Sequence, residues 1–185
     1  LSSSSPMDRL LCGDVGFGKT EIALRASFRV VLGRRRVLVL APTTILANQL
    51  YVSFYSRLSS HAVNVDIVSR FRSAKKIKAV QESILLDKND ILVGTHSLLN
   101  NDIYLKNIGL LIVDEEHRFG VRQKERIKCF KENIDVLSMS ATPIPRSLNL
   151  ALSGIYSISL LQSPPLMRMP IITRVNYFGN RFIRD

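Results

Sequence analysis

The segment Gly13–Thr20 constrains the fold of this chain more than any other stretch of its sequence. It fits the pattern G-x-x-x-x-G-K-[ST], in which glycines let backbone N–H groups come close to a phosphate chain. Lys19 would place a positive charge on the β- and γ-phosphates, and Thr20 would offer its hydroxyl to Mg²⁺. We therefore expect a nucleotide to be bound by Gly13, Asp14, Val15, Gly16, Phe17, Gly18, Lys19 and Thr20.

The neighbouring sequence supplies the context that this motif needs. Residues 10–12 are an apolar run that can form a buried strand, and residues 20–31 place apolar side chains on one helical face. The helix N-terminus would point its free N–H groups at the anion. The alternative is a flexible glycine loop between two core elements, which does not explain why Lys-Thr begins the helix.

Composition indicates a globular domain with one sizeable core. The chain has 185 residues, of which 46% are hydrophobic and 22% charged. It contains no apolar run long enough to span a bilayer, which argues against a membrane protein. Residues 1–6 lack the features of a secretory signal and read as a flexible lead-in. Cys12 and Cys129 are expected to be reduced thiols. Cys12 is interpreted as a small apolar strand residue, and the alternative is a thiol beside the phosphate loop that is sensitive to alkylation.

The net charge of +11, from 26 Lys and Arg against 15 Asp and Glu, favours a polyanionic partner. The alternative is a generally basic, solvated surface. Because the chain has no Trp, contacts to nucleic acid would be made to phosphates rather than by stacking on bases.

Apolar runs alternate with amphipathic stretches along the chain. This alternation predicts an α/β fold with a mostly parallel sheet and helices on both faces. Further strands are expected at 37–41, 63–68, 90–94, 110–113, 136–139 and 158–161, and further helices at 44–54, 74–86 and 148–152.

Polar clusters follow several of these strands, so we expect them to share one edge of the sheet. Asp114, at the end of a buried run, is the candidate Mg²⁺ ligand, and Glu115 is placed to activate a water molecule. Ser140 and Thr142 offer hydroxyls that could sense the γ-phosphate, or could simply cap a turn before Pro143. A zinc site is a weaker hypothesis, because the three histidines are far apart in sequence.

These clusters resemble motifs I, Ia, Ib, II and III of superfamily 2 helicases and translocases, in the expected order. The strings 7–21, 114–121 and 141–146 are similar to a segment shared by the RecG and transcription-repair coupling factor (Mfd) families. Phe17, Thr44 and Glu116 favour the Mfd family, as do the stretches 69–75 and 163–165. The resemblance spans residues 6–175.

The resemblance implies a RecA-like P-loop NTPase lobe of an ATP-driven motor on double-stranded DNA. Such proteins displace stalled RNA polymerase and recruit excision repair without separating the strands. By carry-over, the catalytic residues would be Lys19, Asp114 and Glu115, and the cofactors ATP and Mg²⁺. The residues expected to contact DNA or to couple it to hydrolysis are Thr43, Arg70, Arg72, Thr95, His96, Arg118, Ser140 and Thr142.

The domain expectation is a first motor lobe over residues 7–163, with 164–185 leading to a second lobe that is missing here. Since that lobe would supply an arginine finger worth about 10³–10⁵ in rate, the isolated lobe should bind nucleotide weakly and hydrolyse it negligibly. Polymerase and repair proteins would bind through domains outside this chain, in a bacterial cytoplasm or a plastid. The alternatives are a RecG-type branch-migration lobe and a degenerate P-loop interaction module, and the intact Lys19, Thr20, Asp114 and Glu115 argue against the module.

Overall fold

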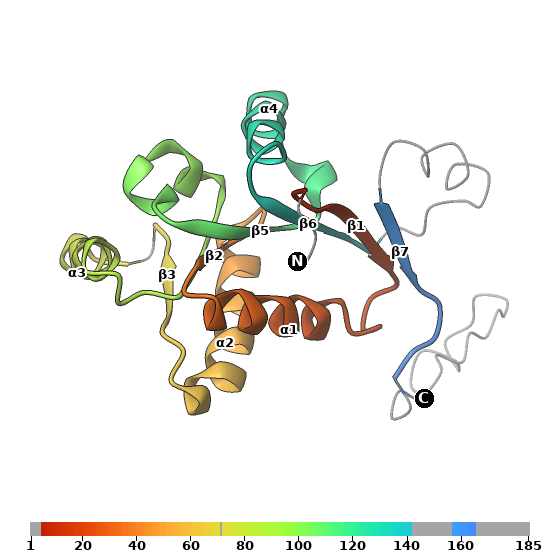
Figure 1. Cartoon of the computed structure of the whole chain (residues 1–185), viewed down its shortest axis with the longest axis horizontal. Coiled ribbons are helices and arrows are strands. Elements are labelled where there is room, and N and C mark those ends of the chain that lie inside the picture. Colours follow the sequence, from red (N-terminus) through yellow and green to blue (C-terminus); the bar gives the residue numbers. More distant parts are fainter. Residues whose placement is uncertain (1–4, 71, 142–156, 166–185) are drawn as a thin grey trace, which may run out of the picture.

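A computed structural model describes residues 5–70, 72–141 and 157–165 of the chain. Within these residues, strands alternate with helices from residue 8 to residue 140 (Figure 1). The strands are β1 (Asp8–Gly13), β2 (Arg36–Leu40), β3 (Val65–Val68), β4 (Ile91–Gly94), β5 (Ile108–Asp114), β6 (Asp135–Ser140) and β7 (Ser157–Leu161). The α-helices are α1 (Lys19–Leu32), α2 (Thr44–Leu58), α3 (Ala74–Leu85) and α4 (Val121–Phe130). Short 3₁₀ helices are η1 (Ser59–His61), η2 (His96–Asn100), η3 (Asp102–Leu105) and η4 (Glu116–Arg118).

The seven strands form one sheet in the order β3-β4-β2-β5-β6-β1-β7, and every neighbouring pair is parallel. The register pairs the ends of the site-bearing strands: Cys12 of β1 lies opposite Ser140 of β6, and Asp114 of β5 lies opposite Met139. Parallel strands bring their carboxyl ends to a common edge. The expected parallel α/β architecture is therefore confirmed.

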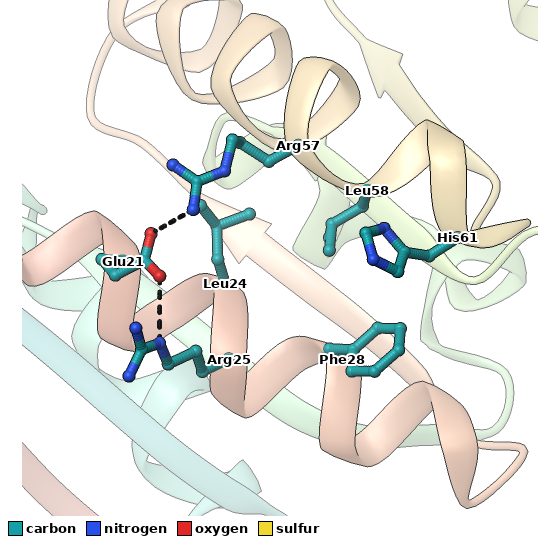
Figure 2. Close-up of a pocket in the computed structure, with 7 residues that line it drawn as sticks. All are labelled: Glu21, Leu24, Arg25, Phe28, Arg57, Leu58 and His61. Atoms are coloured by element: carbon teal, nitrogen blue, oxygen red, sulfur yellow. Dashed lines mark hydrogen bonds and ion pairs between the residues drawn. The ribbon is translucent and has the colours of Figure 1, made fainter.

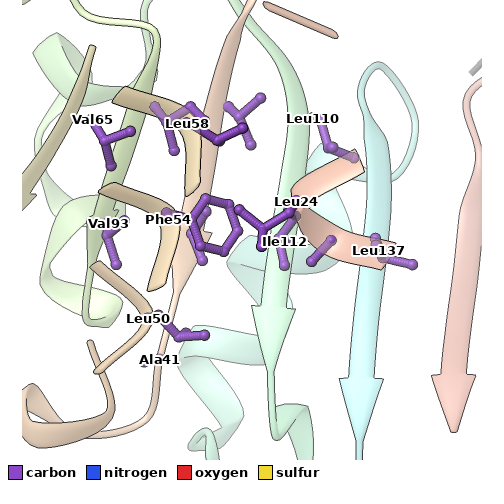
Figure 3. Close-up of a cluster of buried hydrophobic side chains, with 14 of the residues drawn as sticks. Leu24, Ala41, Leu50, Phe54, Leu58, Val65, Val93, Leu110, Ile112 and Leu137 are labelled. Atoms are coloured by element: carbon purple, nitrogen blue, oxygen red, sulfur yellow. The ribbon is translucent and has the colours of Figure 1, made fainter. Parts of the chain in front are cut away.

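Two hydrophobic clusters cover the two faces of the sheet. Strand β2 shows the division, because Val37 and Val39 belong to one cluster and Leu38 and Leu40 to the other. This alternation is the period-2 pattern of a strand that is buried on both sides. Helices α1 and α2 cover the first face, where Phe54 reaches from α2 into the middle of the cluster (Figure 3). Helices α3 and α4 contribute to the second.

Two of the four described α-helices begin at a residue whose side chain caps them. Thr43 has extended backbone, and its hydroxyl accepts a hydrogen bond from the N–H of Leu46 at 3.3 Å, as in an N-cap. Ser73 caps α3 in the same way, through the N–H of Lys76. Gly33 ends α1 as expected. Helix α4 was not anticipated, because Ile127 is its only buried residue and it therefore lacks an apolar stripe.

Some expectations fall on residues that the structure does not describe. They are the coupling role of Thr142, the helix at 148–152 and most of the segment 164–185. In the part of the chain that is described, no helix has both the length and the apolar character needed to cross a bilayer.

Candidate nucleotide site and nucleic-acid pocket

The phosphate-binding loop connects the end of β1 to the start of α1. Gly16 and Gly18 have positive φ angles of 79° and 89°, a conformation that residues with a Cβ atom rarely adopt. A Cβ atom built on Gly18 would meet no atom within 4 Å, so its backbone conformation, not crowding, requires glycine in this structure. The opposite holds at Gly13, where a Cβ atom would lie 2.8 Å from the Cβ of Leu161.

Lys19 folds its ammonium group back onto this loop. Its Nζ donates hydrogen bonds to the carbonyl oxygens of Gly13 at 2.6 Å and Asp14 at 3.0 Å. The loop is further closed by the N–H of Phe17, which donates to the carbonyl of Asp14 at 3.2 Å. The positive charge of Lys19 therefore lies at the N-terminus of α1, where backbone N–H groups and the helix dipole already favour an anion.

Asp114 ends β5 beside this loop. The pKa of its carboxyl group is raised from 3.8 to about 6. Burial is the largest cause and the neighbouring carboxylate of Glu115 the second, while Lys19, the backbone N–H of Glu115 and Arg118 act in the opposite direction. A half-buried carboxylate with an unfavourable charge balance gains from binding a cation. Since Lys19 influences its titration, the two side chains share one electrostatic environment.

Glu115 occupies the turn after β5 with φ 50° and ψ 53°, the left-handed region that a non-glycine residue enters at a cost of about 1–2 kcal/mol. The turn is held by β6, because the N–H of Glu115 donates to the carbonyl of Met139 at 2.9 Å. The side chain is also engaged. Its Oε1 accepts from the N–H of Ala141 at 3.1 Å, and its Oε2 lies 3.3 Å from Nδ1 of His117.

One further contact joins the acidic turn to β6 and was missed at the level of sequence. Ser138, which is 1% exposed, donates its hydroxyl to Oε2 of Glu116 at 2.5 Å. A signal was present, because Ser138 interrupts the apolar run of a buried strand, and a buried hydroxyl needs a partner. Glu116 therefore contributes to the shape of the turn through Ser138.

The residues at this edge fit a nucleotide with a divalent cation. The positive-φ glycines leave the loop open to a phosphate chain, and Thr20 lies beside it in the first turn of α1. Asp114 has its pKa raised by burial and is not neutralised by a salt bridge among the described residues. Thr20 and Asp114 would hold Mg²⁺ together with phosphate oxygens, and the metal would neutralise charge on the phosphates.

Cys12 lies beneath the loop and is 1% exposed. Burial raises the pKa of its thiol, and the nearby Lys19 lowers it by a smaller amount. A protonated, buried thiol is a poor nucleophile, so the interpretation of Cys12 as a small apolar strand residue is favoured over an alkylation-sensitive one.

A second site lies after β2, β3 and β4. It is a cavity of about 310 Å³ lined by Pro42, Thr43, Thr44, Arg70, Thr95, His96 and Ser97. The sequence expectation of DNA contacts named four of these residues, and the fold brings all four together. The hydroxyls of Thr95 and Ser97 lie 3.0 Å apart and can hydrogen-bond to each other. Arg70, which is exposed, and His96, which is half-buried, are the charged or titratable residues that line the cavity.

The remaining expected contact residues lie elsewhere. Arg72 stacks over the ring of Tyr51, with its guanidinium carbon 5.5 Å from the ring centroid. Arg118 is exposed beside the acidic turn, and the adjoining Phe119 is 5% exposed in the second core cluster. Ser140 ends β6 next to Ala141, and through Ala141 the strand reaches the carboxylate of Glu115.

Helix α1 also borders a groove of about 240 Å³ that it forms with α2 and η1 (Figure 2). Glu21, in the first turn of α1, accepts from Arg25 and from Arg57 of α2, both at 2.9 Å. Phe28 packs against His61 with the two rings 5.5 Å apart and nearly perpendicular. At this groove, α1, which follows the phosphate-binding loop, contacts α2, which begins at the second site.

Comparison with known proteins agrees with these features. A family model described as DEAD/DEAH box helicase matches residues 2–151. Transcription-repair-coupling factors of Staphylococcus haemolyticus and Escherichia coli are 51% and 50% identical to this chain, each over 97% of it. The chain spans only 15% and 16% of the length of these two relatives.

Solved structures share the fold. A RecG structure bound to a three-way DNA junction aligns with a TM-score of 0.77 and 33% identity, over 91% of this chain and 22% of RecG. The Pyrococcus furiosus Hef helicase domain aligns with a TM-score of 0.58 and 22% identity, over 85% of this chain and 36% of that one. The second likeness concerns the fold alone. With the family model covering most of its length and a RecA-like helicase fold, the chain belongs to the DEAD/DEAH box helicase family.

Proposed function

We propose that this chain is the first motor lobe of an ATP-dependent translocase on double-stranded DNA, of the kind that couples transcription to repair. The observation that carries the proposal is the arrangement along one sheet edge. The phosphate-binding loop follows β1 and the Asp114–Glu115 turn follows β5, with β6 between these two strands. The pocket with Arg70 and His96 follows the strands beyond β5. Identity of about 50% to transcription-repair-coupling factors supports this choice of motor.

In the proposed reaction, this chain's residues bind and orient the nucleotide. Lys19 would exchange the carbonyls of Gly13 and Asp14 for the phosphates. Thr20 and Asp114 would hold Mg²⁺, which would supply positive charge against the phosphates. Glu115 accepts the proton of the attacking water. The carboxylate of Glu115 accepts a hydrogen bond from the N–H of Ala141, so a shift of Glu115 on phosphate release would move the end of β6 and the segment after it.

Turnover in this proposal needs a second lobe from the longer protein. An arginine supplied in trans is worth about 10³–10⁵ in rate, so the chain alone should bind nucleotide and hydrolyse it negligibly. We further propose that RNA polymerase and repair proteins are contacted by other parts of the longer protein, in a bacterial cytoplasm. The relatives compared are bacterial and lend no support to a plastid location.

The test is binding of a Mg–ATP analogue by calorimetry to the wild-type chain, to Lys19→Ala and to the control Lys88→Ala. Loss of a charge-assisted phosphate contact costs about 1.5–3 kcal/mol, so Lys19→Ala should bind more than about tenfold more weakly. Lys88 is exposed and follows α3, so its removal should leave affinity unchanged. Equal binding by all three proteins would place the nucleotide elsewhere and remove the basis of the proposal.

The second candidate is a RecG-type junction motor, favoured by the RecG structure as a neighbour at 33% identity. The two candidates differ in the domains attached to the motor and not in this lobe. Displacement of a stalled polymerase by the longer protein would support the first, and branch migration of a DNA junction without that displacement would support the second.

A further inference from the structure

Helix α4 carries a concentration of positive charge that the proposed nucleotide and DNA sites do not use. Four of its residues are basic and exposed, namely Arg122, Lys124, Arg126 and Lys128, and Glu125 is its one acidic residue. Residues four apart lie on the same side of a helix, so the basic residues form two flanks. Arg122 and Arg126 form the first, here called the arginine flank. Lys124 and Lys128 form the second.

The arginine flank is joined to the pocket of Thr43, Arg70, Thr95 and His96 through η2. Arg126 Nη1 donates to Oδ1 of Asn100 at 2.7 Å, and Asn100 is the last residue of η2. The first residue of η2 is His96, which lines the pocket. One short 3₁₀ helix therefore has the pocket at its start and the arginine flank at its end.

The bond to Asn100 orients Arg126 without neutralising it. An amide oxygen carries no net charge, and the guanidinium keeps further N–H donors for a second acceptor. Within the part of the chain that the structure describes, Arg122 has neither an ion-pair nor a hydrogen-bond partner. The surroundings of the lysine flank are different, because an acidic residue lies near its end. Lys131, which follows α4, has its Nζ 3.1 Å from a carboxylate oxygen of Asp8.

We propose that the arginine flank of α4 is a second phosphate-binding site for duplex DNA, continuous through η2 with the pocket of Thr43, Arg70, Thr95 and His96. This inference rests on the proposed function. Arginine suits such a site, because its planar fork of donors matches phosphate oxygens in pairs. Duplex DNA presents one charge per about 1.7 Å of axis, so a strip of protein longer than the pocket meets additional phosphates. An acidic protein segment could also pair with these two arginines. Such a partner would not explain why the arginine flank adjoins the pocket, whereas a duplex that lies along both does.

The experiment measures binding of a short duplex to the chain by fluorescence anisotropy across a salt series. The test variant is Arg122→Gln/Arg126→Gln, and the matched control is Lys124→Gln/Lys128→Gln, which removes the same charge from the same helix. Each phosphate contact contributes about 0.9 to the slope of log K against log salt. The arginine variant should therefore lower the slope by about 1.8 and weaken binding at about 50 mM salt by tenfold or more. The lysine variant should change the slope by much less.

A third variant, Arg70→Gln/His96→Gln, separates this inference from the proposed function. If the wild type binds the duplex and the pocket variant loses affinity while the arginine variant behaves like the lysine variant, the inference is overturned and the proposed function stands. An equal loss of affinity in both α4 variants would mean that DNA responds to the total positive charge of α4 and not to the arginine flank, which would also overturn the inference. If the wild type shows no salt-dependent duplex binding, the proposed function fails as well. Thermal melts of all variants identify any that are unfolded.

Discussion

The carboxylate of Glu115 accepts a hydrogen bond from the backbone N–H of Ala141 at 3.1 Å, which ties the acidic turn after β5 to the end of β6. A second bond runs the other way, from the N–H of Glu115 to the carbonyl of Met139. The two strands carrying the proposed catalytic base and the proposed coupling segment are thus locked together at their carboxyl ends. A movement of Glu115 that withdraws its Oε1 would release the N–H of Ala141.

Replacing Glu115 tests how much this link stabilises the fold. Glu115→Gln keeps an oxygen that can accept from Ala141, so its free energy of unfolding should stay within about 0.5 kcal/mol of wild type. Glu115→Ala leaves the N–H of Ala141 without this partner and should cost about 1 kcal/mol. Urea denaturation of the three proteins measures both values. Equal stability of the Gln and Ala variants would show that the contact contributes nothing to the folded state.

The backbone at the same position makes a separate prediction. Because Glu115 has a φ of 50°, glycine should be tolerated there better than alanine. Neither residue has a side chain that can reach Ala141, so the comparison isolates backbone strain. We expect Glu115→Gly to be more stable than Glu115→Ala by about 1 kcal/mol in the same denaturation assay. A less stable glycine variant would mean that the turn relaxes away from this conformation.

The raised pKa of Asp114 predicts a pH-dependent cost of folding. Its carboxyl group titrates near 3.8 when unfolded and at about 6 in the folded chain, so the folded state holds the proton more tightly. The stabilising contribution of protonated Asp114 is full below pH 4 and is lost as the pH rises through about 6. Asp114→Asn should therefore unfold with a free energy about 1–3 kcal/mol higher than wild type near pH 8.

Near pH 4 the two proteins should differ little, because Asp114 is then mostly protonated when folded. Denaturation at both pH values, without nucleotide or Mg²⁺, measures the gap. A constant gap across the range would mean that the substitution acts through packing and not through charge.

The central strands of this fold were predictable from sequence because they are buried on both faces. Runs such as 37–41 and 110–113 contain almost nothing but aliphatic residues, which is the pattern of a central parallel strand. The phosphate-binding loop was also predictable, since its glycines and Lys-Thr are fixed by the geometry of a phosphate turn.

The parts that escaped sequence reasoning depend on contacts between distant segments. Helix α4 has one buried residue and hence no periodic pattern. Arg70 and Arg72 stand in one basic stretch, and the fold alone decides that Arg70 lines the pocket while Arg72 stacks on Tyr51. Ser138 and Glu116 meet only because β6 runs beside β5.

The Glu21 cluster in Figure 2 predicts a small effect despite its short distances. The side chains of Arg25 and Arg57 are 78% and 62% exposed, so water screens both pairs. Exposed ion pairs contribute about 0.2–1 kcal/mol each. Because Glu21 makes two such pairs, Glu21→Gln should lower the free energy of unfolding by less than about 2 kcal/mol at low salt, with a smaller loss at high salt. A loss above about 2 kcal/mol would show that the cluster holds α1 and α2 together.

Arg36 predicts the opposite, a large effect from one buried cation. It is 3% exposed, and its guanidinium donates to the carbonyl oxygens of Asn89 at 3.0 Å, Lys106 at 2.5 Å and Ile84 at 3.2 Å. The carbonyls of Ile84 and Asn89 flank the connection from α3 to β4, and that of Lys106 lies in the turn before β5, so one side chain joins two connections. Burial lowers the pKa of Arg36, while the carboxylates of Asp87 and Asp90 raise it.

Arg36→Met preserves much of the side-chain length but leaves the carbonyls of Asn89 and Lys106 without this donor, while the carbonyl of Ile84 still accepts from the N–H of Asp87. Each buried acceptor that loses its partner costs about 1–3 kcal/mol, so we expect a total loss of at least about 2 kcal/mol. Arg35→Met is the matched control, because the neighbouring Arg35 is exposed and should change stability by less than about 0.5 kcal/mol. Urea denaturation compares the two variants. Similar small losses would mean that water replaces the guanidinium, and that the two connections are held by the strands they join.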